Sequence, residues 1–422
     1  MNDKFAGYIC SVCGSQYSPD QVTYTCPKDG GNLDIVLDYA AIQKFVDYRQ
    51  IISSEEYSLW RYLPLLPVSD PGGHETPLHA AGLTPVFSSE KLGKALGIKR
   101  LWIKDESRNP TASFKDRASA VVVGRAREIG AEVVVTASTG NAGAALAGMS
   151  AAIGQKAVIF APKTAPPAKV AQLLVFGAQV LLVDGTYDDA FDLTILAAQE
   201  FNWYCRNTGY NPFTAEGKKT AAFEIWEWML KQTNQDPAYL SKHFSKLALF
   251  VSVGDGNIIS GIHKGFRDLV ALGWLEKSPR IFGVQAQGSA AVANAYFSGS
   301  EQIVPVKADT LADSISVDLP RDGLRAVRAA RQTDGGYIVV SDDEILRAIA
   351  ELGMIGIFAE PAGAASYAGL VKAIGQGLIK PDDPVMVINT GSGLKDVRAA
   401  VRAVPEAPVI EPTLEALTRV IK

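Results

Sequence analysis

The chain has 422 residues, 47% of them hydrophobic and 20% charged, which is the composition of a soluble globular protein with more than one hydrophobic core. Its 41 basic and 45 acidic residues give a formal net charge of −4, which excludes a general electrostatic affinity for nucleic acid or for an anionic membrane. The sequence shows no signal-peptide core and no uninterrupted apolar run of about 18 residues, so we expect a cytoplasmic protein.

Residues 1–37 have the cysteine spacing of a zinc ribbon. Cys10 and Cys13 form one Cys-x-x-Cys pair, Cys26 opens a second, and Asp29 stands where a fourth thiolate is usual. Three sulfurs and a carboxylate can hold a structural zinc ion, but a degenerate ribbon can also fold without metal. The residues alone leave both alternatives open.

Residues 38–75 form an arm or linker between the ribbon and the main body. Helical patches from 39 to 48 and the aromatic run at 60–64 predict an arm that lies across the rest of the molecule. The segment 71–78 is rich in turn residues and leads into the main body.

From residue 76 onwards, short apolar runs alternate with helical patterns. This alternation predicts βαβ units in parallel sheets that helices cover on both faces, so the expected fold class is α/β. The expected strands lie at 101–103, 133–136, 157–160, 180–183, 247–251, 280–284 and 384–388. Helices are expected at 143–152, 168–176 and 187–201, after the second, third and fourth of these strands.

The segment 109–117 follows the first of these strands and opens a helix that runs to Gly130. Thr111 or Ser113 is expected to cap this helix, which places Lys115 in its first turn. The positive end of a helix dipole lowers the pKa of an amine, and a neutral lysine can attack an aldehyde. Lys115 is therefore a candidate Schiff-base lysine, although an ordinary capped helix with surface charges fits the same residues.

Three further loops follow expected strands, at the sheet edge where ligands of α/β proteins bind. The loop 137–143 offers backbone amides and Asn141 to a carboxylate, and the glycine-rich loop 253–261 suits a phosphate group. The loop 389–396 brings hydroxyl groups that can meet a heteroaromatic nitrogen. Each loop alone also fits a tight turn, but together with Lys115 they describe a pocket for pyridoxal phosphate.

These motifs, in this order, resemble the threonine synthase branch of the fold-type-II, tryptophan synthase β-like, pyridoxal-phosphate enzymes. The resemblance runs from about residue 5 to about residue 400. It rests on Ser113-x-Lys115-Asp116-Arg117, Ser138-Thr139-Gly140-Asn141, the loop 254–257 and Thr390-Gly391-x-Gly393-Leu394-Lys395-Asp396. Further marks are Asn211-Pro212, Glu216-Gly217-x-Lys219-Thr220 and Glu360-Pro361-Ala362.

The resemblance implies a role for each matching residue. Lys115 would link to the cofactor and act as the acid and base, with Phe114 packed nearby and Asn141 bonded to the ring oxygen. Thr390 would face the pyridine nitrogen. The backbone of Gly254, Asp255, Gly256, Asn257 and Ile258 would hold the cofactor phosphate, and Ser138, Thr139 and Gly140 would bind the substrate carboxylate.

The reaction implied by the resemblance converts O-phospho-L-homoserine and water into L-threonine and phosphate. Two departures from the family pattern leave the substrate open: Thr214 replaces an arginine that usually follows the Asn-Pro pair, and residues 313–322 differ from the usual sequence. Lys218, Lys219 or Arg321 is expected to bind the substrate phosphate instead. The alternatives are a cysteate synthase, which uses O-phosphoserine and sulfite, and a serine or threonine dehydratase.

The resemblance also implies the domain organisation. A large domain that binds the cofactor would comprise 76–117 and 206–405, with a smaller mobile domain, 118–205, inserted into it and a tail at 406–422. Each domain would contain a parallel sheet between layers of helices, and the ribbon would be an N-terminal extension. A homodimer is expected.

Overall fold

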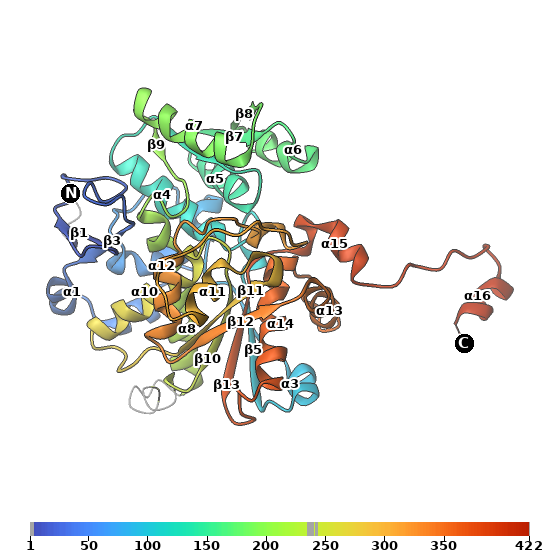
Figure 1. The fold of residues 1–422 in the computed structure, drawn as a ribbon. Helices are drawn as coiled ribbons and strands as arrows, with labels where there is room; N and C mark the ends of the chain where they lie inside the picture. The colour runs from blue at the N-terminus through green and yellow to red at the C-terminus, as the bar shows by residue number, and fades with distance from the viewer. Residues whose placement is uncertain (1–3, 234–239, 241–243, 422) are drawn as a thin grey trace.

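Three β-sheets organise the part of the chain that the computed structural model describes, residues 4–233, 240 and 244–421 (Figure 1). The first three residues of the ribbon segment and the last residue of the tail lie outside these described residues. No helix in the described ranges is long and apolar enough to cross a membrane.

The first sheet is antiparallel, has the order β2-β1-β3, and forms the predicted N-terminal ribbon. Its strands are β1 (Phe5–Cys10), β2 (Gln16–Tyr17) and β3 (Leu33–Leu37). Tyr8 and Ile35 are buried in the main hydrophobic core, and the Phe5 ring packs edge-on against Phe213, with centroids 5.8 Å apart. The ribbon is therefore anchored to the body by apolar contacts.

The arm follows the ribbon and consists of short helices. They are α1 (Tyr39–Phe45), α2 (Tyr48–Ile52) and two 3-10 turns, η1 (Leu59–Leu65) and η2 (Pro77–Ala80). The Trp60 indole donates to the Leu78 carbonyl at 3.1 Å, and Arg61 pairs with Glu227 of the main body at 2.8 Å. These contacts tie the arm to the main body.

The second sheet has six strands in the order β12-β11-β10-β13-β5-β4, all parallel except β4, which is antiparallel to β5. They are β4 (Val86–Ser88), β5 (Arg100–Asp105), β10 (Ala248–Ser252), β11 (Arg280–Ala286), β12 (Gly336–Val340) and β13 (Pro384–Asn389). Alternate residues of β10 face two cores: Leu249 and Val251 pack into one, and Phe250 into the other. The sheet is thus covered on both faces, as the sequence predicts.

Helices and 3-10 turns around this sheet carry the loops of the candidate site. The α-helices are α3 (Glu90–Leu96), α8 (Phe213–Gln232), α10 (Asn257–Ala271), α11 (Ala291–Phe297), α12 (Gly323–Arg331), α13 (Asp342–Gly353), α14 (Pro361–Gly375) and α15 (Val397–Arg402). The 3-10 turns are η3 (Glu106–Arg108), η4 (Gln287–Ser289), η5 (Asp313–Ile315) and η6 (Gly393–Lys395).

The third sheet is parallel, has the order β8-β7-β6-β9, and lies above the six-stranded sheet in Figure 1. Its strands are β6 (Val133–Ala137), β7 (Lys156–Pro162), β8 (Gln179–Val183) and β9 (Tyr204–Cys205), and its helices are α5 (Asn141–Ala152), α6 (Pro167–Val175) and α7 (Tyr187–Glu200). The helix α4 (Lys115–Glu128) packs against both α5 and α8 and so joins the two large sheets.

The predicted α/β class is confirmed, and each expected strand is present with small shifts at its ends. The sequence analysis missed β4 and β12, both of which lie at edges of the six-stranded sheet. After α15 the chain runs away from the body and ends in α16 (Leu414–Val420), which has no buried residue (Figure 1). The domain boundaries inferred from the sequence stay a prediction.

Candidate active site

Lys115 is the first residue of α4 and follows the carboxyl end of β5. The residues before it are tied to the third predicted loop: the Phe114 amide donates to the Thr390 carbonyl at 2.9 Å. Ser113 forms an isolated antiparallel bridge with Gly391. Two motifs that are far apart in the sequence therefore meet at the lysine.

The start of α4 differs from the predicted capping by Thr111 or Ser113. The N-cap residue is Phe114, whose side chain makes no capping bond. The Thr111 amide donates to the Asp116 carboxylate at 2.6 Å, and its hydroxyl donates to the other oxygen of that group. Ala112, with φ of 63°, adopts a left-handed conformation that is uncommon outside glycine. Asp116 thus holds a strained loop against the lysine, a contact that capping preferences do not reveal.

The amine of Lys115 is easier to deprotonate than that of a surface lysine. Burial lowers its pKa, although the nearby carboxylates of Asp255 and Glu360 oppose this shift. Burial also raises the pKa of both carboxyl groups. The pKa of Lys115 is therefore lowered, as the sequence predicts, but the largest cause is burial and not the helix dipole.

The glycine-rich loop joins β10 to α10 and is closely packed on its outer side. Gly256 has φ of 90°, and a Cβ atom there would lie 2.7 Å from the Asp322 carbonyl oxygen. A Cβ atom on Gly254 would lie 2.9 Å from the Cα of Ile315. Glycine is therefore required at both positions, and the first-turn amides of α10, which lack intrahelical partners, begin where this loop ends.

Two neighbouring lysines of α8 have different environments. Lys218 is fully buried, and its Nζ lies 2.5 Å from the Asn257 side-chain oxygen in the glycine-rich loop. Burial lowers the pKa of Lys218 well below its usual value. Lys219 instead lies between Glu216, at 2.5 Å, and Asp268, at 2.7 Å. Two carboxylates therefore neutralise the charge of Lys219, and its predicted role in substrate binding stays a prediction.

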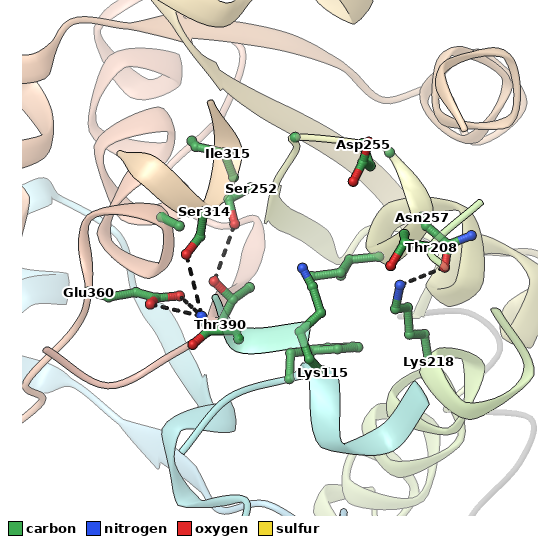
Figure 2. Close-up of a pocket in the computed structure, with 16 residues that line it drawn as sticks. Lys115, Thr208, Lys218, Ser252, Asp255, Asn257, Ser314, Ile315, Glu360 and Thr390 are labelled. Atoms are coloured by element: carbon green, nitrogen blue, oxygen red, sulfur yellow. Dashed lines mark hydrogen bonds between the residues drawn. The ribbon is translucent and has the colours of Figure 1, made fainter. Parts of the chain in front are cut away.

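Asn141 is the first residue of α5 and has an acidic partner. Its side-chain nitrogen donates to both oxygens of Glu360, each at 2.9 Å (Figure 2). In the loop before it, the Gly140 amide donates to the Ser138 hydroxyl at 3.2 Å. The side-chain oxygen of Asn141 stays available to accept a hydrogen bond from a ligand.

Thr390 follows the last strand of the sheet and lies beside Ser252, the last residue of β10. Their hydroxyl oxygens are 3.5 Å apart, and Figure 2 shows the two side chains facing each other. A hydroxyl pair carries no formal charge, so a heteroaromatic nitrogen at this position would meet neutral groups.

Two adjoining cavities collect the remaining predicted residues. The smaller cavity is lined by Phe114, Lys115, Asn141, Lys218, Ser252, Gly254, Asp255, Gly256, Asn257, Ile258 and Thr390, among others. The larger cavity shares Lys115, Asn141 and Asp255 with the first and is also lined by Ser138, Thr139, Gly140, Arg206 and Arg321. In Figure 2 the side chains of Lys115 and Lys218 reach towards the same space.

The residues around the smaller cavity fit pyridoxal phosphate. That group needs an amine for its aldehyde, donors for its phosphate and a partner for its ring nitrogen. Lys115, the glycine-rich loop and Thr390 offer these on different walls of one cavity. Lys218 gives the strongest support, because this buried amine forms no ion pair with a carboxylate of the described residues, and a phosphate dianion would favour its charged form.

Several cavity residues were missed by the sequence analysis. Ser252 and Arg206 stand at strand ends, so the rule that ligands bind beyond carboxyl ends could have identified both. Glu360 was noted as part of a motif but received no role. Ser314 lies in η5, a 3-10 turn of three residues that is too short to give a periodic signal.

The ribbon brings its four predicted metal ligands together. The ligand atoms of Cys10, Cys13, Cys26 and Asp29 all lie within 4.8 Å of one another. The Cys10 sulfur is 3.4 Å from an Asp29 oxygen, and the sulfurs of Cys13 and Cys26 are 3.8 Å apart. This donor set of three sulfurs and one carboxylate fits a tetrahedral zinc ion.

Comparisons with known proteins identify the family of the chain. The family model "Pyridoxal-phosphate dependent enzyme" matches residues 78–391. A threonine synthase of Methanocaldococcus jannaschii is 38% identical, and one of Methanosarcina acetivorans is 36% identical, each over 98% of both chains.

Solved structures share the fold. Threonine deaminase isoform 2 of Solanum lycopersicum, in its processed form, has a TM-score of 0.65 at 24% identity, over 82% of this chain and 94% of that one. Maize serine racemase has a TM-score of 0.61 at 22% identity, over 74% of this chain and 88% of that one. The chain therefore belongs to the family of pyridoxal-phosphate-dependent enzymes, in the branch that includes the threonine synthases.

Proposed function

We propose that this protein is a threonine synthase, which converts O-phospho-L-homoserine and water into L-threonine and phosphate. The observation that carries the proposal is the match to two proteins named threonine synthase over 98% of their length and of this chain. Lys115, the loops around it and both cavities lie within the region that these relatives match.

Lys115 is the group that moves protons in this proposal. Pyridoxal phosphate, when bound, supplies an electron-withdrawing ring that stabilises negative charge next to the reacting carbons. The reaction needs protons removed and returned at the α and β carbons of the substrate. Because burial favours the neutral amine, Lys115 Nζ can take up a proton at one carbon and return it at another.

The remaining residues orient the two ligands. We assign the substrate carboxylate to Ser138, Thr139 and Gly140, which line the larger cavity at the start of α5. Asn141 and Thr390 would hold the ring of the cofactor on opposite edges. These assignments agree with the roles that the sequence resemblance implies.

We assign Lys218 to the phosphate of the cofactor instead of that of the substrate. Its Nζ contacts Asn257 at 2.5 Å and lines the smaller cavity with the glycine-rich loop. An ammonium at this position would add a full positive charge to the amides that begin α10. The cation for the substrate phosphate must then come from another residue.

A parallel assay tests the proposed activity. The purified holoenzyme is supplied with O-phospho-L-homoserine, with O-phosphoserine and sulfite, and with L-threonine, and products are identified by mass spectrometry. We expect L-threonine and phosphate from the first substrate only. Sulfonate formation from O-phosphoserine would instead indicate a cysteate synthase, and an oxo acid from L-threonine would indicate a dehydratase.

Three further expectations from the sequence join the proposal: a structural zinc ion in the ribbon, a homodimer and a cytoplasmic location. The clustered ligands Cys10, Cys13, Cys26 and Asp29 support the zinc ion. Metal analysis should find about one zinc per chain in the wild type and none in a Cys10→Ser/Cys13→Ser variant. Light scattering during gel filtration measures the oligomeric state.

A further inference from the structure

Arg206 stands directly after β9, at the carboxyl edge of the four-stranded sheet. Its amide donates to the Val135 carbonyl at 2.7 Å, which fixes the backbone as a continuation of the strand pair. The side chain is completely buried within the protein. The guanidinium is therefore held inside the molecule and not on a flexible surface stem.

The hydrogen bonds of this guanidinium are incomplete. Nε donates to the Ser119 hydroxyl at 3.2 Å, and Nη1 donates to the Thr208 hydroxyl at 2.7 Å. Nη2 has no partner among the described residues, and no described carboxylate forms an ion pair with the group. Burial lowers the pKa of Arg206 to about 10. A buried charge without a counter-ion lowers the stability of the protein, and a bound anion would offset this loss.

The unpaired guanidinium borders the cavity in which the chemistry takes place. Arg206 lines the larger cavity together with Lys115 and the carboxylate loop 138–140. Thr208, which accepts the bond from Nη1, lines both cavities. An anion held at Arg206 would therefore share one space with the reactive amine.

The other cationic candidates are already engaged. Arg321 lines the same cavity, but its Nη2 pairs with Asp188 at 3.0 Å and its guanidinium lies 4.6 Å from the Phe191 ring centre. Thr214 is uncharged, and its hydroxyl donates to the Asn211 carbonyl at 2.7 Å. Arg206 is therefore the fully buried guanidinium of this cavity that has no acidic partner among the described residues.

We propose that Arg206 binds the phosphate group of the substrate through its free guanidinium edge, next to the loop that binds the carboxylate. The identification of this anion as a substrate phosphate rests on the proposed function. The site itself is a buried receptor for a tetrahedral oxyanion, a group that suits the planar donor fork of arginine.

The test compares ligands with and without a phosphate on the holoenzyme. In Arg206→Met, kcat/KM for O-phospho-L-homoserine should fall about 100-fold, and inorganic phosphate, measured by calorimetry, should bind at least about tenfold more weakly. The Kd of L-threonine should change less than about twofold, because it keeps the carboxylate but lacks the phosphate. Arg206→Lys keeps the charge without the fork and should recover part of both losses.

Arg321→Met is the matched comparison, since it removes an arginine from the same cavity that is already paired. A larger loss of phosphate binding in Arg321→Met than in Arg206→Met would overturn the proposal. Equal weakening of L-threonine and of phosphate would also overturn it, because Arg206 would then bind the carboxylate or support the fold. If Arg206→Met does not fold, Arg206→Lys with a normal cofactor spectrum takes its place. Its loss of phosphate affinity is then compared with its loss of L-threonine affinity in the same way.

Failure of the proposed function is distinguishable from failure of this inference. A wild-type enzyme that does not convert O-phospho-L-homoserine would refute the proposed function alone. The phosphate titration still decides the site, because it requires no turnover. Equal phosphate affinity in the wild type and in Arg206→Met would refute the anion site even in an active threonine synthase.

Discussion

Lys115 and Arg117 stand two residues apart in α4, but their surroundings differ completely. Arg117 is fully buried and paired with Glu106, at 2.7 Å, and with Glu224, which also pairs with Lys104 at 2.6 Å. On the cavity side, Lys115, Lys218 and Arg206 form no ion pair with a described carboxylate. Opposite sides of one helix turn therefore face a neutralised cluster and a cluster of basic side chains that form no ion pair with the described residues.

The pKa values report this difference with opposite signs. The carboxylates of Glu106 and Glu224 outweigh burial and raise the pKa of Arg117, whereas burial dominates and lowers the pKa of Arg206. A paired buried charge is part of the folded structure. An unpaired buried charge lowers the folding stability until a ligand supplies the opposite charge. The comparison therefore separates structural residues from ligand-binding residues.

The largest effect is expected at Lys115. Lys115→Ala removes the proposed acid and base, and kcat should fall at least about 10⁴-fold. Circular dichroism and the melting temperature should stay close to those of the wild type, because this lysine contributes no ion pair. Borohydride reduction of the wild-type holoenzyme, followed by peptide mapping, should place the cofactor on Lys115. Cofactor attached at another lysine would contradict the assignment.

The paired cluster of Lys104, Glu106, Arg117 and Glu224 should instead lose stability and keep its activity when one member is changed. Glu224→Gln removes one of the two carboxylates that Lys104 and Arg117 share and should lower the free energy of unfolding by about 3–5 kcal/mol. The folded variant should keep most of its turnover. Urea unfolding followed by fluorescence measures the loss.

A surface pair provides the control for Glu224→Gln. Glu301 pairs with Arg328 at 2.6 Å, and its side chain is 40% exposed. Glu301→Gln should cost less than about 1 kcal/mol. Similar decreases in the free energy of unfolding at Glu224 and Glu301 would show that burial does not determine how much these ion pairs stabilise the protein.

The sequence predicts one side of this comparison better than the other. The positions of Lys115, the glycine-rich loop and Thr390 follow from strand ends and turn residues, which are local signals. The different environments of Lys218 and Lys219 do not follow from local signals. Adjacent helix residues point about 100° apart, and only the packing of α8 against α10 decides which lysine meets a carboxylate.

Tertiary contacts explain the other errors as well. Asp116 reaches back to Thr111, so a loop–helix contact replaces the expected cap. Arg206 directly follows a two-residue strand, β9, which is too short to give a periodic pattern. Its lack of an acidic partner becomes visible only when all neighbouring elements are in place.

A substitution at Lys218 tests the cluster of unpaired basic residues, Lys115, Lys218 and Arg206, without removing the reactive amine of Lys115. Lys218→Met replaces a buried amine with an apolar side chain of similar length, so the cofactor should bind about 50-fold more weakly. The cofactor-free protein should be as stable as the wild type or more stable, because the variant no longer buries an amine that has no counter-ion. Calorimetric titration of apoenzyme with pyridoxal phosphate gives the affinity. A destabilised apoenzyme with unchanged affinity would place Lys218 among the structural charges.

His263 offers the smallest and most gradual effect, because this buried group stays neutral. Burial, with a contribution from Arg267, lowers its pKa from 6.5 to about 4. Below pH 6.5 the unfolded chain takes up a proton that the folded chain refuses until about pH 4, so stability is lost as the pH falls through this window. At pH 5 the loss relative to pH 8 should be roughly 2 kcal/mol, and His263→Gln should abolish that part of it. His74→Gln, at an exposed position, should keep the wild-type pH dependence, so equal behaviour of the two variants in urea unfolding at pH 5 and 8 would contradict the argument.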